Sequence, residues 1–280
     1  MPFYFLRKII KFENLQNMSE PNIIIPPSLN LDKRQMEHAD ELAKEYIRAL
    51  DSSLYPNDYF PEICKFFKKR GLAICVGNPA GGILLTGINP SRSKSSSDVS
   101  FCYSFADSVI HSKKNSYWGK KRDLVGDALL NETAYLDLFP FGFTDQNSFE
   151  ELIERNMSFR AAMLGITQRE IEGYIKPKLI IVANKQSSYY WGTNPDATWM
   201  GYCMELVGDI PSSLIEKGLA LYRITGFHSN RDDRINQDLL TNSNLEGTLI
   251  LFYAMYDERN IDKMLTSTDV EELYLLAKNE

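Results

Sequence analysis

The sequence has few residues of the kinds that build metal sites and covalent catalysts. Its 280 residues include only four cysteines and three histidines. The cysteines form no CxxC pair, which argues against a zinc site and against a disulfide framework. P-loop, GxGxxG, GxSxG and HExxH motifs are all missing, so the common nucleotide-binding, dinucleotide-binding, serine-hydrolase and zinc-protease sites are excluded. We therefore expect neither a metal nor a cofactor.

Long apolar runs and an excess of positive charge are missing as well. No run approaches the roughly 20 apolar residues of a membrane helix, so no membrane partner is expected. The net charge of −6 disfavours a broad basic surface wrapped around a duplex, although phosphate contacts can be local. The apolar and basic start, MPFYFLRKIIKF, has no small-residue cleavage site and is not interpreted as a signal peptide. Reduced cysteines favour a cytoplasmic location.

What the sequence does contain is an alternation of strands and helices between about residues 83 and 226. This pattern predicts an α/β fold with a mostly parallel sheet covered on both faces. We expect residues 31–280 to form one such domain after an N-terminal extension, residues 1–30, with Met18 as an alternative native start. Apolar spacing and turn residues predict helices over 31–51, 61–70, 116–130 and 148–172, and strands over 133–139, 178–184 and 219–226.

Two further local patterns give more specific expectations. The apolar runs 72–76 and 83–87 flank the Gly-rich segment GNPAGG, which favours a β-hairpin. The tail from about residue 243 is expected to be helical, and its last helix to start at a capping box formed by Thr268 and Glu271.

Polar residues follow three of the predicted strands. These segments are GINPS (87–91), LDLFPF (136–141) and GFHSNRDDR (226–234). Because ligands of open α/β sheets bind outside the carboxyl ends of the strands, all three are expected to converge on one crevice. Taken singly, each has a plain explanation: Asn89 before Pro90 marks a turn, Asp137 pairs with an arginine or caps a neighbour, and His228 is a loop histidine. His38 is expected on a solvated helix face.

The order of these segments resembles the uracil-DNA glycosylase superfamily. GINPS is similar to the GINPG or GMNPG motif of the mismatch-specific and single-strand-selective branches, and GFHSN to the second motif, often HPSP. SYW (116–118) and IIVANKQSSYYWG (180–192) are similar to other landmarks, so the likeness covers about residues 83–240. It implies an α/β/α sandwich with three layers around a short, mostly parallel central sheet.

The resemblance also implies roles for individual residues in excising a base from DNA. Asn89 would orient a water molecule at the sugar, and His228 would donate a hydrogen bond to the departing base. Gly87, Ile88 and Asp137 would line the base pocket, and Phe101 or Phe105 would stack on a base flipped out of the helix. Asp137 stands where many members carry Asn. An ionised carboxylate only accepts hydrogen bonds, so the preferred base is left open.

The DNA partner, single- or double-stranded, would be held through its phosphates by residues after the two motifs: Ser91, Arg92, Lys94, Ser229, Asn230 and Arg231. A denser basic run, Lys113 to Arg122, is interpreted equally well as a solvated helix face. Two other functions remain open: a non-catalytic nucleobase or nucleic-acid-binding protein with the same fold, and a hydrolase of free nucleosides. A monomer is expected.

Overall fold

The computed structural model describes most of the chain after residue 30. The described residues are 26, 29, 31–51, 61–91, 100–114, 116–154, 156–184, 187–194, 199–229, 240–253, 255 and 264–279. The N-terminal extension, the alternative start Met18 and the candidate DNA-contacting residues Arg92, Lys94, Asn230 and Arg231 therefore lie outside the described residues.

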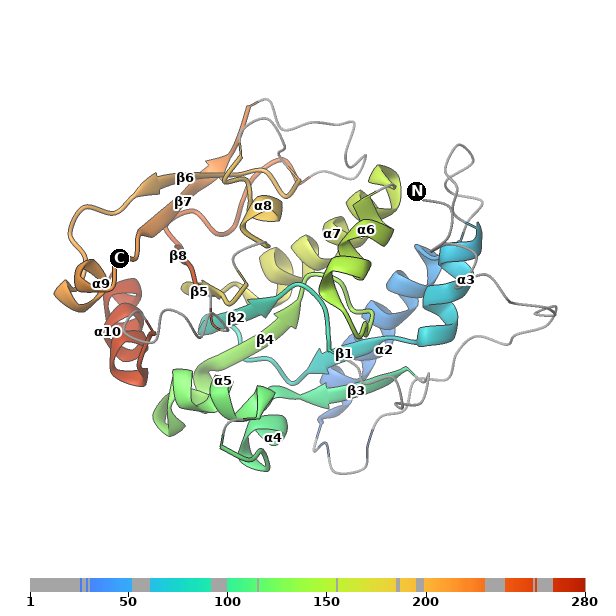
Figure 1. Ribbon diagram of the computed structural model, residues 1–280, viewed down its shortest axis with the longest axis horizontal. Helices are drawn as coiled ribbons and strands as arrows, with labels where there is room; N and C mark the ends of the chain where they lie inside the picture. The colour runs from blue at the N-terminus through green and yellow to red at the C-terminus, as the bar shows by residue number, and fades with distance from the viewer. Residues whose placement is uncertain are drawn as a thin grey trace.

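A mixed sheet forms the centre of the fold (Figure 1). Within the described residues, its strand order is β4-β2-β5-β8-β7-β6. Four neighbours are parallel and form the core of the sheet: β4 (Thr133–Asp137), β2 (Ile83–Gly87), β5 (Leu179–Val182) and β8 (Leu249–Phe252). β7 (Leu221–Phe227) is antiparallel to β8, and β6 (Tyr202–Leu206) is antiparallel to β7. The expected α/β class with a mostly parallel sheet is confirmed.

Helices cover both faces of this sheet because its strands are apolar on both sides. One face packs on α2 (Lys33–Arg48), α6 (Gln146–Glu154) and α7 (Met157–Glu170), which continues into a π-helical turn, η3 (Ile171–Ile175). The other face packs on α4 (Phe105–Ile110), α5 (Tyr117–Val125), α9 (Ser212–Glu216) and α10 (Ser267–Lys278). The remaining elements are α3 (Pro61–Arg70), the 3-10 turn η2 (Asp127–Glu132) and α8 (Ser188–Trp191).

The expected hairpin of residues 72–76 and 83–87 is wrong. β1 (Ala73–Val76) pairs in parallel with β3 (Phe101–Ser104), and β2 pairs with β4 and β5. The side-chain amide of Asn78 bonds the backbone N–H and C=O of Tyr135, which places the end of β1 along the free edge of β4. β1 and β2 do run in opposite directions, but β4, which follows both of them in the sequence, lies between them.

The tail is only partly the helical segment that was expected: its last helix, α10, is present, but a strand precedes it. The short run LILF is β8, a buried strand inside the sheet, because both of its faces are covered by helices. The capping box of α10 is formed by Thr266 and Asp269, two residues before the expected pair. Thr266 accepts from the backbone N–H of Asp269, whose side chain accepts from the N–H of Thr266. No helix of the described part of the chain is long and apolar enough to cross a membrane.

The crossing from β1 to β2 requires a glycine. A Cβ on Gly82 would lie 2.0 Å from the carbonyl oxygen of Glu132, the residue that precedes β4. We therefore expect Gly82→Ala to destabilise the protein by about 1–3 kcal/mol, the usual cost of overpacking. Gly173→Ala is the matched control, since a Cβ there meets nothing within 4 Å. It should raise stability by about 0.5–1 kcal/mol. Urea unfolding measures both, and equal effects would contradict the close approach.

Candidate functional site

The carboxyl ends of β2 and β4 lie side by side and bring several predicted residues together. Gly87 is in register with Asp137, and the chains continue together, with hydrogen bonds from Leu138 N to Gly87 O (3.1 Å) and from Phe139 N to Ile88 O (2.8 Å). Asn89 therefore follows this shared edge directly. Its side chain is half-buried, and its amide nitrogen donates to Pro90 O at 3.2 Å.

Gly87 leaves the space that the Asp137 carboxylate occupies. A Cβ at Gly87 would lie 2.5 Å from Asp137 Oδ1 and 3.2 Å from the hydroxyl oxygen of Tyr135. Asp137 is only 5% exposed, and Tyr135 donates a hydrogen bond to its Oδ1 at 2.7 Å. A second hydroxyl, that of Tyr117, lies 2.9 Å from the hydroxyl of Tyr135. Because Tyr135 gives its proton to Asp137, Tyr117 is the donor in this second bond.

Lys121 is the cationic member of the same cluster. It is 1% exposed, and its ammonium lies 3.4 Å from the ring centroid of Tyr117, 5.0 Å from that of Tyr135 and 5.4 Å from that of Trp118. Such cation–π contacts partly replace lost hydration. The solvated helix face that the basic run suggested is thus wrong for Lys121, because the Tyr117–Lys121 side of α5 faces the sheet.

Burial acts in opposite directions on the two charges. It raises the pKa of the Asp137 carboxyl above its ordinary value, while the Lys121 charge and the Tyr135 hydrogen bond oppose that rise. Burial also lowers the pKa of the Lys121 ammonium, and the attraction of Asp137 opposes that fall. Perturbed, mutually coupled groups at a strand edge are typical of functional sites. We call Asp137, Lys121, Tyr135 and Tyr117 the acid–base cluster.

The two candidate stacking residues have different environments. Phe105 is 2% exposed and stacks on Tyr135, with ring centroids 5.8 Å apart and an interplanar angle of 11°. It belongs to the core beneath the acid–base cluster and offers no open face. Phe101 is half-buried at the start of β3, with its ring centroid 6.0 Å from that of Tyr103. Of the two, only Phe101 keeps part of its surface accessible.

The third strand end does not share this edge. β7 runs antiparallel to β8, and residues after Ile224 extend beyond the amino end of β8. His228 therefore does not follow one of the parallel strands whose carboxyl ends meet at Gly87 and Asp137, as the sequence analysis assumed. His228 donates its backbone N–H to Gly201 O at 2.9 Å, and its ring Nε2 donates to Gly192 O at 3.3 Å. Ser229, next to it, is exposed, as is Ser91, which bridges to Phe143.

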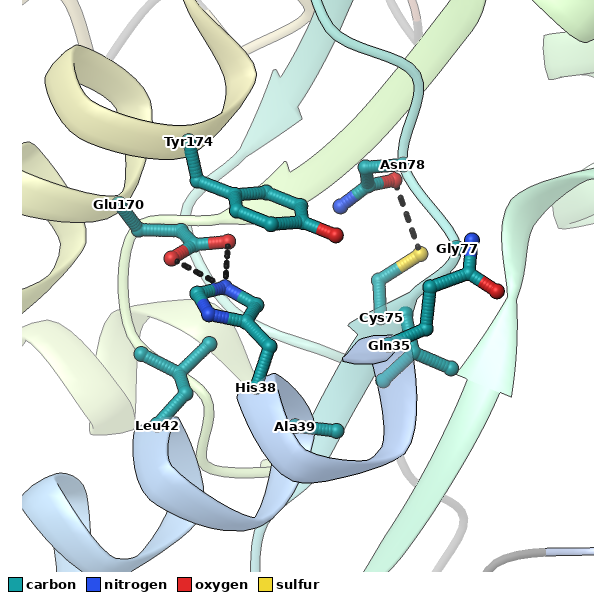
Figure 2. Close-up of a pocket in the computed structure, with 10 residues that line it drawn as sticks. Gln35, His38, Ala39, Leu42, Cys75, Gly77, Asn78, Glu170 and Tyr174 are labelled. Atoms are coloured by element: carbon teal, nitrogen blue, oxygen red, sulfur yellow. Dashed lines mark hydrogen bonds and ion pairs between the residues drawn. The ribbon is translucent and has the colours of Figure 1, made fainter. Parts of the chain in front are cut away.

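A small pocket is lined by Asn78 together with residues of α2, β1, α7 and η3 (Figure 2). His38 on α2 points across it to Glu170, whose two carboxylate oxygens are each 2.9 Å from His38 Nε2. The His38 ring stacks on Tyr174 at 3.8 Å with an interplanar angle of 8°. His38 is therefore not the solvated residue that was expected: it joins α2 to α7. On the opposite wall, burial raises the pKa of the Cys75 thiol, which argues against a nucleophilic cysteine.

Sequence reasoning missed three members of the acid–base cluster, although two signals were present. Tyr135 and Asp137 are two residues apart in a strand, so they point to the same face. Tyr117 and Lys121 are four apart in a helix and so lie on one side of it. In the described part of the chain, no group of three or more His, Cys, Asp or Glu residues is placed to hold a metal ion. Comparison with protein-family models, curated proteins and solved structures finds no match to this chain.

The His38–Glu170 pair should make stability depend on pH. The hydrogen bond to Glu170 raises the pKa of His38 in the folded protein above its ordinary value of 6.5. The pair therefore contributes fully below about pH 6.5, and the contribution is lost as pH rises through the folded-state pKa. We expect His38→Gln to cost more free energy of unfolding at about pH 5.5 than at about pH 8.5.

Urea unfolding of the wild type and of His38→Gln at the two pH values measures this difference. His111→Gln is the matched control, because His111 is exposed at the end of α4. A cost for His38→Gln that is the same at both pH values would show that the ion pair does not form.

Proposed function

We propose that the protein hydrolyses the N-glycosidic bond of a damaged or mismatched base in DNA, at the edge where β2 and β4 end. The proposal includes a fold related to the uracil-DNA glycosylase superfamily, with helices layered on both sides of a parallel central sheet. One observation carries it: the GINPS segment runs directly beside Asp137, so the two parts of the sequence resemblance that concern base binding and water positioning adjoin in space.

Asp137 suits base recognition better than its residue type suggested. Since burial raises its pKa, the carboxyl is able to hold a proton nearer to neutral pH than an exposed carboxyl does. A protonated carboxyl donates as well as accepts, so it is able to bond a base carbonyl such as that of uracil. Tyr135 occupies Oδ1, which leaves Oδ2 for the base.

In this proposal the same group donates the hydrogen bond to the departing base that the sequence resemblance assigns to His228. The glycosidic bond breaks toward an oxocarbenium-like sugar and an anionic base. A preorganised donor at the base oxygen stabilises that anion, and removing such a donor costs other enzymes on the order of 10²–10³ in rate. In this proposal neutral Asp137 is the donor, while the buried Lys121 ammonium favours the negative charge that develops.

Asn89 completes the proposed mechanism by holding the attacking water on the far face of the sugar. Its amide nitrogen donates to Pro90 O, which fixes the side chain and leaves the amide oxygen to accept from water. An amide does not take up a proton near neutral pH, so Asn89 positions the water without acting as a base. This feature equally favours a second candidate: a protein that binds a nucleobase without cleaving it.

Substitutions at Asn89 distinguish the two candidates. We expect labelled oligonucleotides carrying uracil, hypoxanthine, xanthine or a thymine mismatch to become alkali-labile with the wild-type protein. Asn89→Ala should slow excision about 100-fold, the cost of losing a positioned reactant, and Asn89→Asp should retain or raise the rate.

Asn242→Asp is the matched control, since Asn242 is exposed and distant in sequence from the strand edge. Binding of these oligonucleotides without alkali-labile product would identify the non-catalytic candidate. Release of base from free nucleosides alone would instead identify a nucleoside hydrolase.

The protonation of Asp137 should set the pH profile. If the neutral carboxyl is the donor, excision is fast below the folded-state pKa of Asp137 and falls as pH rises through it. The Lys121 charge lowers that pKa, so Lys121→Met should move the descending limb to higher pH. Single-turnover rates between about pH 5 and pH 8 measure the limb. If Lys121→Met does not shift the descending limb of the pH profile, or if that limb is still present in Asp137→Asn, neutral Asp137 is not the donor.

A further inference from the structure

A second cluster of aromatic and cationic side chains lies beyond the acid–base cluster. Arg160 of α7 is placed over the ring of Trp199, with its central carbon 4.6 Å from the ring centroid, and 6.0 Å from that of Tyr190. Tyr189 of α8 adjoins both rings, with centroid distances of 5.6 Å to Tyr190 and 6.4 Å to Trp199. We call Arg160, Tyr189, Tyr190 and Trp199 the arginine–aromatic cluster.

The charge of Arg160 has no anionic partner in the part of the chain that the structure describes. The residue is 5% exposed, and its hydrogen bond, from Nε to Ile153 O at 3.3 Å, leaves the two terminal amino groups unused. Those groups are not among the fully buried, unpartnered atoms, so they keep a small accessible surface. A cation this deeply buried is normally paired.

A second donor at the start of α7 is also unused. Asn156 is fully buried and caps the helix through its Oδ1, which accepts from Phe159 N, while its Nδ2 finds no acceptor in the described structure. Two carboxylates of α6, Glu150 and Glu154, act on Tyr190 but form no ion pair with Arg160 within the described residues. Of the two unused donors, the Arg160 guanidinium is the one suited to an anion, because Asn156 Nδ2 is fully buried.

The cluster is connected to the proposed reaction edge through one residue. Phe139 packs edge-on against Tyr190, with ring centroids 5.5 Å apart and an interplanar angle of 77°. The backbone of Phe139 also bonds Ile88, the residue before Asn89. The arginine–aromatic cluster therefore packs against the residues that continue β2 and β4 beyond the proposed reaction edge.

We propose that the arginine–aromatic cluster binds a nucleotide unit, with Arg160 on its phosphate and Tyr189 as the surface on which its base stacks. A guanidinium binds phosphate through two parallel hydrogen bonds, and the terminal amino groups of Arg160 are the open ones. Tyr189 is 38% exposed, which leaves ring surface for a base. The proposal rests on the proposed function only for placing this unit in DNA, next to the nucleotide that is cleaved.

Binding measurements test this subsite without any cleavage. Fluorescence anisotropy with a labelled single-stranded oligothymidylate, at several salt concentrations, gives affinity and salt dependence. Arg160→Gln should weaken binding about tenfold or more and reduce the salt slope by about one phosphate contact. Tyr189→Ala should lower the binding affinity about 5- to 150-fold, as expected for the loss of one stacked base, and should leave the salt dependence unchanged. Arg160→Lys should keep the slope with reduced affinity.

Competition by thymidine monophosphate, thymidine and inorganic phosphate separates the possible sources of the phosphate. Monophosphate should compete better than either thymidine or phosphate alone if both halves of the unit are bound. Arg34→Gln is the matched control, since Arg34 is exposed on α2. Urea unfolding confirms that each variant is folded.

Wild-type affinity in both Arg160→Gln and Tyr189→Ala would overturn the proposal, as would a wild-type protein that binds neither the oligonucleotide nor the monophosphate. Failure of the proposed function gives a different result. In that case no oligonucleotide becomes alkali-labile, but the losses caused by Arg160→Gln and Tyr189→Ala remain.

Discussion

The burial of the Asp137 carboxylate is the constraint on which the rest of the candidate site depends. A buried carboxylate is costly unless hydrogen bonds and opposite charge compensate it. Tyr135 on the same strand supplies the hydrogen bond, and Lys121 on α5 supplies the charge. Gly87 on the neighbouring strand supplies the space. Three elements, β4, β2 and α5, are thereby held in one arrangement by a single side chain.

Much of the fold was predictable because the spacing of apolar, Gly and Pro residues along the sequence indicates where helices and strands begin and end. The helix from Lys33 and the strands ending at Gly87, Asp137 and Phe227 follow from apolar periodicity and from the Gly and Pro residues that end them. The hairpin and the tail were not predictable in this way. Whether β4 inserts between β1 and β2, and whether LILF is a strand or a helical turn, is decided by contacts between residues far apart in the sequence.

The same distinction applies to the site. Gly87, Asn89 and Asp137 could be predicted to meet because parallel neighbours end at one edge. His228 was assigned to that edge on the assumption that its strand is also parallel, and strand direction is not encoded in a short apolar run. Lys121 was read as solvated because its neighbours in sequence are basic. Its burial depends on the rings of Tyr117 and Tyr135, which the fold brings around its ammonium group. The four-residue spacing of Tyr117 and Lys121 predicts only the first of these contacts.

The two clusters differ in how their polar groups are hydrogen-bonded. In the acid–base cluster, hydrogen bonds join Tyr117, Tyr135 and one carboxylate oxygen of Asp137, and the charges of Asp137 and Lys121 shift each other's pKa. In the arginine–aromatic cluster, the terminal amino groups of Arg160 have no hydrogen bond within the described residues. Hydrogen bonds within a cluster are suited to orient a reacting group, and unused donors are suited to bind a ligand. Phe139 packs on Tyr190, and its backbone N–H bonds the carbonyl of Ile88, so the arginine–aromatic cluster is tied to the residue that precedes Asn89.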